Sequence, residues 1–193
     1  MDSRLSLFHS DLFLRKNIGT KDQIDDLRRQ ILETKNTEGT ALTENNPNCW
    51  RSNANYQNID WLMKATQELT MRAAEYYFEM DEFFKGYVTQ KRININYWTN
   101  VNDPGGGNVL HTHEKDCFAA VYYLDAEDTG LIHFSNPANV LNQCNRQSPF
   151  TRAMSLPPED NSLILWPAWI PHEVEVNQSN KQRINLAFSI MVM

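Results

Sequence analysis

The sequence predicts an α+β fold that is mainly β, a β-sandwich or barrel buttressed by helices. Helical periodicity occurs only in the first half of the chain, whereas alternating apolar residues, typical of strands, dominate from residue 87 onward. An α/β fold would need helical patterns between the strands, and the second half of the sequence shows none. The 193 residues are 41% hydrophobic, which is enough for one core. We therefore expect a single domain over residues 1–193, with a helical buttress at about 18–85 and a β core at about 87–193.

The first expected elements are an extended segment and an amphipathic helix. Ser6–Lys16 is rich in Leu and Phe, and it leads to Thr20 and Gln23, which have the spacing of a capping box. In that motif each side chain bonds the backbone N–H of the other residue at the start of a helix. We expect the helix to reach about residue 34. Its apolar residues at helical spacing are Ile24, Leu27 and Ile31.

A polar stretch separates this helix from the next. Lys35–Gln57 holds many Asn residues and one Pro, so we expect a long surface connection. Ile59–Met80 then shows a second helical pattern. That helix is long enough to cover one face of a sheet.

The strands follow. In Tyr87–Val101 the residues Ile93, Ile95 and Tyr97 alternate with polar residues, as a half-buried strand requires. Further expected strands are Phe118–Leu124, Leu131–Phe134, Leu163–Trp166, His172–Val176 and Arg183–Met193.

Charge and cysteine usage exclude several classes of partner. The net charge of −6 argues against general nucleic-acid binding, which needs clustered Lys and Arg. Cys49, Cys117 and Cys144 show no C-x-x-C spacing, so neither a disulfide framework nor a zinc knuckle is indicated, and a reducing compartment fits. The longest apolar run, Leu163–Pro171, is about half of a membrane span. We expect a cytoplasmic protein without membrane contact.

Histidines give the sharpest functional signal. Four of the five lie between residues 111 and 172. On a strand, His111 and His113 would point to one face, an arrangement that offers paired ligands to a metal ion. His172 could complete the set from another strand. The alternative is that each of these imidazoles only makes a local hydrogen bond.

Arg183 suggests an anion site beside them. On an alternating strand it shares a face with Asn185, Ala187 and Ser189, opposite the apolar residues. A buried guanidinium is costly without an anionic partner, and its fork matches a carboxylate. A small diacid between Arg183 and the metal is one hypothesis; pairing of Arg183 with Glu173, Glu175 or solvent is the other.

Five segments then occur in a specific order: Asn108–His113, Ala120–Asp125, Gly130–Phe134, Leu165–His172 and Arg183–Asn185. Together they resemble the 2-oxoglutarate and Fe(II)-dependent oxygenase superfamily, most of all the oxygenase branch related to prolyl hydroxylases. The resemblance covers roughly Arg92 to the C-terminus. It implies a double-stranded β-helix, or jelly roll, over about 87–193, with iron at its mouth.

The resemblance also implies roles for single residues. His111, His113 and His172 correspond to the Fe(II) ligands. Arg183 corresponds to the residue that binds 2-oxoglutarate, with Tyr123 as its hydroxyl partner, while Tyr122 should point away from the pocket. Asn108 is a further candidate for contact with this co-substrate.

The implied activity is that of a dioxygenase. It would hydroxylate an unidentified substrate, consume O2 and release succinate and CO2, with no catalytic acid or base beyond the metal centre. Two alternatives stay open: a cupin-like metal-dependent dioxygenase or isomerase that does not use 2-oxoglutarate, and a non-catalytic jelly-roll binding protein.

The sequence departs from the superfamily pattern at His113, where a carboxylate is usual. Glu114 could supply one through a bulge, or Asp116 through a turn. We interpret His133 as structural or as a support for the ligands. Trp98 and Trp166 are expected to pack in the core or at the rim of the barrel.

The end of the chain bears on assembly. The strand that finishes at Met191–Met193 could lie at a sheet edge and pair with another chain, so a homodimer is possible.

Overall fold

The computed structural model describes residues 2–7, 10–38, 42–43, 46–79, 92–136 and 154–192. These ranges contain helices α1 (Lys21–Glu38) and α2 (Asp60–Glu79) and twelve strands. The expected helix end at Met80, the expected strand start at Tyr87, and Cys144 lie outside them.

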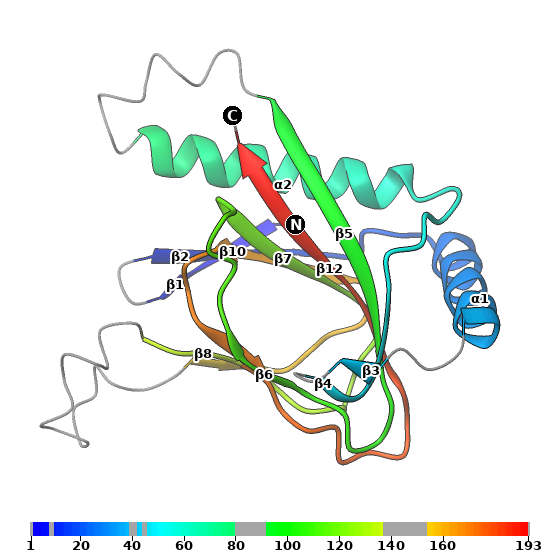
Figure 1. The fold of residues 1–193 in the computed structure, drawn as a ribbon. Coiled ribbons are helices and arrows are strands. Elements are labelled where there is room, and N and C mark those ends of the chain that lie inside the picture. Colours follow the sequence, from blue (N-terminus) through cyan, green and yellow to red (C-terminus); the bar gives the residue numbers. More distant parts are fainter. Residues whose placement is uncertain are drawn as a thin grey trace, which may run out of the picture.

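The strands form two antiparallel sheets that face each other (Figure 1). The large sheet contains, in spatial order, β1 (Asp2–Leu7), β2 (Ser10–Lys16), β10 (Ser162–Pro167), β7 (Phe118–Asp125), β12 (Arg183–Val192), β5 (Ile93–Asn102), β4 (Asn46–Ser52) and β3 (Leu42–Thr43). The small sheet contains β6 (Asn108–His111), β11 (His172–Val174), β8 (Ile132–Phe134) and β9 (Met154–Leu156). Strands β5 to β12 thus contribute four strands to each sheet. This arrangement confirms the predicted α+β jelly roll buttressed by helices.

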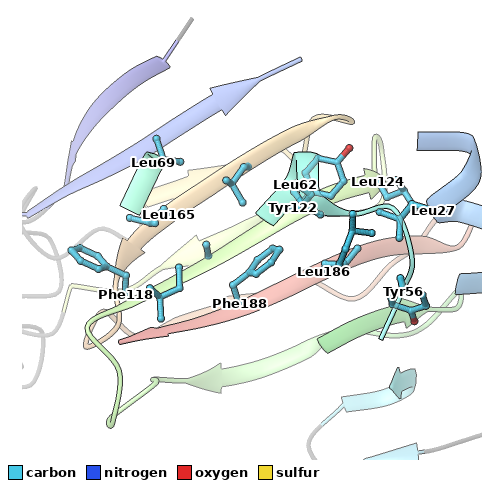
Figure 2. Close-up of a cluster of buried hydrophobic side chains, with 14 of the residues drawn as sticks. Leu27, Tyr56, Leu62, Leu69, Phe118, Tyr122, Leu124, Leu165, Leu186 and Phe188 are labelled. Atoms are coloured by element: carbon cyan, nitrogen blue, oxygen red, sulfur yellow. The ribbon is translucent and has the colours of Figure 1, made fainter. Parts of the chain in front are cut away.

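Side-chain alternation along β7 separates two apolar clusters. Phe118, Tyr122 and Leu124 face the helices and pack with residues such as Leu27 and Leu62 of α1 and α2 (Figure 2). The intervening residues of β7, which are Ala119, Val121 and Tyr123, face the small sheet. One face of the large sheet therefore builds the core, and the other is left to line the space between the sheets.

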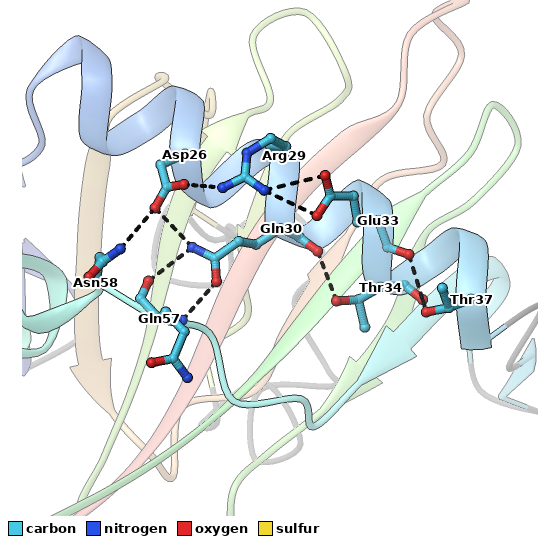
Figure 3. Close-up of polar contacts among 8 residues, drawn as sticks. All are labelled: Asp26, Arg29, Gln30, Glu33, Thr34, Thr37, Gln57 and Asn58. Atoms are coloured by element: carbon cyan, nitrogen blue, oxygen red, sulfur yellow. Dashed lines mark hydrogen bonds and ion pairs between the residues drawn. The ribbon is translucent and has the colours of Figure 1, made fainter.

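Helix α1 begins at the predicted capping box. The Thr20 backbone N–H donates to Gln23 Oε1 at 2.9 Å, and the Gln23 N–H donates to Thr20 Oγ1 at 3.4 Å. Gln30 Oε1 accepts from the Gln57 N–H at 2.7 Å, and Gln30 Nε2 donates to the Gln57 carbonyl at 3.0 Å (Figure 3). These bonds attach α1 to the segment that leads into α2.

The prediction of a surface connection over Lys35–Gln57 is wrong for much of that segment. Helix α1 continues to Glu38, and residues 46–52 form β4, which pairs with β5. Trp50 is buried in the helix-side cluster, and Cys49 is buried as well. The segment's polar composition hides this strand, because it becomes stable only through long-range pairing with β5 and burial of one large ring.

The C-terminal strand is not an edge, contrary to the expectation above. β12 lies between β7 and β5, and Val192 pairs with Ile93 of β5. Its backbone hydrogen-bonding groups are used within the sheet. β12 therefore has no free edge through which it could pair with a second copy of the chain.

Neither of the described helices is long and apolar enough to cross a membrane.

Helix α2 offers a test of the helix-side core. Leu69 is 1% exposed, whereas Met71 on the same helix is 48% exposed. Leu69→Ala should lower the free energy of unfolding by about 2–5 kcal/mol because it leaves a cavity, and Met71→Ala should change it by less than about 0.5 kcal/mol. Urea unfolding followed by circular dichroism measures both. Equal losses in the two variants would contradict this placement of α2.

Candidate metal centre

A cavity of about 460 Å³ opens between the two sheets. Its walls come from β4, β5, β7, β10 and β12 of the large sheet and from β6, β8 and β11 of the small one. Among the described lining residues there is no Asp or Glu. The size suits a small ligand, and such cavities hold ligands through a few polar groups set in an apolar wall.

His111, His113 and His172 meet at this cavity. Strands β6 and β11 pair with His111 directly opposite His172, and their ring centroids are 4.2 Å apart. The His113 ring lies 5.3 Å from each of the other two. One ring nitrogen from each residue lies within 4.8 Å of the others. One metal ion could therefore be held by all three, as predicted.

Backbone contacts orient two of these rings. His111 Nδ1 lies 2.7 Å from the Val109 carbonyl, and His172 Nδ1 lies 3.1 Å from the Ile170 carbonyl. A carbonyl oxygen only accepts, so both Nδ1 atoms carry the proton. The lone pairs of both Nε2 atoms are then free for a metal.

His113 reaches the cluster in a different way from that expected. β6 ends at His111, so His113 lies just beyond the strand. Its backbone N–H donates to the Ala168 carbonyl at 3.0 Å, which holds the turn against the large sheet. The shared strand face that the sequence suggested is thus replaced by a hydrogen-bonded turn.

Burial keeps two of the imidazoles neutral. Burial, with a smaller contribution from the proximity of His111, lowers the pKa of His172 to about 3 and that of His113 to about 4. A metal ion binds only the unprotonated imidazole. These residues are therefore in the binding form at neutral pH.

Two tryptophans pack against the histidines. Trp98 stacks on His113 at a centroid distance of 5.8 Å and an angle of 23°. Trp166 meets His172 edge-on at 4.8 Å. Both tryptophans line the cavity. They have the packing role that the sequence predicted, and the residues they pack against are two of the candidate metal ligands.

Neither alternative carboxylate joins the three histidines. Glu114 is exposed, and Asp116 accepts a hydrogen bond from the Ser189 hydroxyl. Within the described ranges, the group of side chains suited to a metal consists of His111, His113 and His172. The arrangement offers three nitrogen donors and no negative charge.

Arg183 is buried at the start of β12, with 1% of its surface exposed. Its Nε donates to Thr129 Oγ1 at 2.8 Å, and its Nη2 donates to the carbonyls of Thr129 and Gly130. Its Nη1 is buried and has no partner. Burial lowers the pKa of the guanidinium, and no ion pair joins Arg183 to a described carboxylate; Glu175 instead pairs with His133.

Tyr123 lies near Arg183 and also lines the cavity. Tyr122 points to the opposite face, where its ring packs on Trp61 at 5.7 Å. Burial raises the pKa of Tyr123, and the positive charge of Arg183 opposes that shift. The Tyr123 hydroxyl therefore stays protonated close to the guanidinium.

Asparagines add polar groups to the walls. Asn108 lines the cavity as predicted, and its Oδ1 accepts from Asn102 Nδ2 at 3.2 Å. Asn100, which the sequence analysis missed, donates through Nδ2 to Asn185 Oδ1 at 3.1 Å. Its own Oδ1 is buried without a partner. Its position on the same strand face as Trp98 was the signal that could have identified it.

Arg51 is the second residue that the sequence analysis missed. It lies on β4, lines the cavity and places its guanidinium 4.4 Å from the centroid of a Trp98 ring. No sequence signal marked it, because its segment has the composition of a loop.

His133 lies outside the metal centre. Its Nδ1 is 2.6 Å from Ser155 Oγ, and its Nε2 is 2.9 Å from Glu175 Oε1. These contacts link β8, β9 and the end of β11 and support the structural interpretation.

Comparison with known proteins places this geometry in context. A family model described as "Putative 2OG-Fe(II) oxygenase" matches residues 96–189. No curated protein is detectably similar to the chain in sequence.

Solved structures share the fold at low sequence identity. A Pseudomonas putida prolyl-4-hydroxylase has a TM-score of 0.62 and 13% identity, over 93% of this chain and 91% of that one. A Trichoplax adhaerens prolyl hydroxylase, in complex with a hypoxia inducible factor peptide fragment, has values of 0.64 and 14%, over 93% and 83%. HygX from Streptomyces hygroscopicus, with nickel and 2-oxoglutarate bound, has values of 0.62 and 8%, over 93% and 82%. At these identities the likeness concerns the fold.

Removal of one imidazole tests the metal centre. His172→Ala should weaken Co(II) binding by at least about 100-fold, since it removes a direct ligand and even indirect supports of ligands cost 10–100-fold. His133→Ala is the matched control and should bind Co(II) as the wild type does. Calorimetric titration measures both, with circular dichroism to verify folding. Equal affinities in the two variants would contradict the assignment.

Proposed function

We propose that this chain, whose residues 96–189 match the 2OG-Fe(II) oxygenase family model, is a 2-oxoglutarate-dependent non-haem iron oxygenase that hydroxylates a substrate held in front of its three histidines. In the balanced reaction, a substrate C–H bond, O2 and 2-oxoglutarate give a C–OH group, succinate and CO2. The observation that carries the proposal is the convergence of three imidazoles on a cavity whose lining residue Tyr123 lies near a buried, incompletely paired arginine, Arg183.

The histidines fit a divalent iron. We assign His111, His113 and His172 as its ligands, with Nε2 as the donor atom of His111 and His172, because Nδ1 of each is engaged by a carbonyl. Three protein nitrogens leave further coordination positions open, which a catalytic centre requires. Bound iron supplies the activation of O2 together with 2-oxoglutarate.

Arg183 fits the distal carboxylate of 2-oxoglutarate. Its Nε and Nη2 are already held by Thr129 and Gly130, so the guanidinium is fixed in place, and Nη1 remains as a donor without a partner. A carboxylate would complete its hydrogen bonding and compensate its buried charge. The Tyr123 hydroxyl would donate a hydrogen bond to the same carboxylate. Asn108 offers an amide at the cavity wall.

The apolar wall has a separate task. Val121, Ile132, Val174 and Trp166 line the cavity around the histidines. They exclude water from the position where the substrate would lie, which strengthens polar contacts inside and protects against side reactions. None of the protein's side chains needs to act as an acid or base in this scheme.

Turnover tests the proposal. Protein reconstituted anaerobically with Fe(II), then exposed to air and 2-oxoglutarate, should form succinate and CO2 in equal amounts. Protein loaded with Zn(II), which has no redox chemistry, is the control and should form none. Product analysis by mass spectrometry and trapped CO2 measures both. Bound iron without succinate formation would overturn the proposal and favour a jelly-roll protein of another kind.

A substitution of Arg183 tests the co-substrate site. Arg183→Lys should raise the dissociation constant of 2-oxoglutarate by about tenfold or more, because one ammonium cannot both keep the bonds to Thr129 and Gly130 and place a charged donor where Nη1 lies. The affinity for Co(II) should stay at the wild-type value. Lys181→Ala, at a side chain 61% exposed, is the matched control and should leave both affinities unchanged. Loss of Co(II) together with 2-oxoglutarate, or of neither, would count against the role of Arg183.

A further inference from the structure

A second arginine, Arg51, lines the cavity and comes from β4, far from Arg183 in the sequence. In the pairing of β4 with β5, Arg51 lies opposite Asn100, which is on the cavity face, whereas its neighbour Trp50 is buried in the helix-side core. Arg51 therefore belongs to the cavity wall by its position in the strand and not through a chance side-chain conformation.

The guanidinium of Arg51 has a support but no counter-ion. It lies over Trp98, whose ring also stacks on His113, so the support connects it to the metal centre. No described carboxylate lies within ion-pair distance of Arg51, and none lines the cavity. Arg51 is exposed and keeps contact with water, and partial loss of hydration at the cavity wall lowers its pKa.

The net charge of the cavity also favours an anionic ligand. Three neutral imidazoles leave a divalent metal with its full charge, where a carboxylate ligand would remove one unit. A dianionic co-substrate bound to that metal and to Arg183 would leave one positive charge, and Arg51 adds a second. An anionic substrate would add an ion pair to this positive charge, whereas a neutral or cationic substrate would not.

We infer that Arg51 binds an oxoanion of the primary substrate, a carboxylate or a phosphate-type group, at the wall next to Trp98. The inference rests on the proposed function and narrows it to small anionic substrates. The cavity volume of about 460 Å³, part of which 2-oxoglutarate would fill, leaves room for a small molecule. Asn100, with its unpartnered Oδ1 opposite Arg51, adds an acceptor for a hydroxyl or amide of that substrate.

A paramagnetic probe tests the site without knowledge of the substrate. Protein is loaded anaerobically with Mn(II) and saturated with 2-oxoglutarate, and methylphosphonate is added. If Arg51 holds the anion near the metal, Mn(II) should accelerate its ³¹P relaxation. The neutral dimethyl ester of methylphosphonate should show no such acceleration. Arg51→Met should reduce the effect for the anion by about tenfold, the loss expected for a charge-assisted hydrogen bond.

The matched control is another arginine over an aromatic ring. Arg4 lies 4.4 Å from the centroid of Tyr76, away from the cavity, and Arg4→Met should leave the relaxation effect unchanged. Equal effects in Arg51→Met and wild type would overturn the inference, as they would show the anion on the metal alone. A loss of 2-oxoglutarate affinity in Arg51→Met as large as in Arg183→Lys would also overturn it, because Arg51 would then bind the co-substrate.

The outcomes separate this inference from the proposed function. Succinate formation with no Arg51-dependent relaxation would reject the anion site alone. Arg51-dependent relaxation without succinate formation would reject the oxygenase reaction and keep the anion site. Competition by acetate distinguishes the two groups: displacement of methylphosphonate at equal concentration indicates a carboxylate substrate, and its failure indicates a phosphate-type one.

Discussion

The pairing of β11 with β6 is the contact on which the proposed metal centre depends, because it sets His172 directly opposite His111. Both strands are short, and each imidazole is held by a carbonyl two residues earlier in its own chain segment. The ring positions are therefore set by backbone geometry before any metal arrives. Such preorganisation lowers the cost of assembling ligands around an ion.

The two faces of the large sheet serve different purposes. Its outer face is covered by α1 and α2 and carries the larger apolar cluster, whereas its inner face carries a smaller one beside the cavity. Alternation along β12 places Leu186 and Phe188 under the helices and Asn185 and Ala187 at the cavity. Stability and chemistry are thus divided between the two faces of the same strands.

The two arginines of the site differ in a way that separates their roles. Arg183 is buried and held by Thr129 and Gly130, which fixes a charge whose only unsatisfied donor is Nη1. Arg51 keeps solvent contact and rests on Trp98. A rigid, desolvated charge suits one constant ligand, and a partly hydrated one suits a ligand that enters and leaves with each turnover.

Local sequence patterns determined much of this protein. Periodicity predicted both helices and most jelly-roll strands, and it predicted the faces of Tyr122, Tyr123 and Asn185, because side-chain direction within one element depends only on neighbours in the chain. The spacing of the histidines also predicted which three of them lie together in the structure. Only the tertiary structure decided that β4 is a strand and that Arg51 reaches the cavity. The reason is that β4 exists through its pairing with β5, about fifty residues away, and a polar segment carries no local sign of a partner so distant.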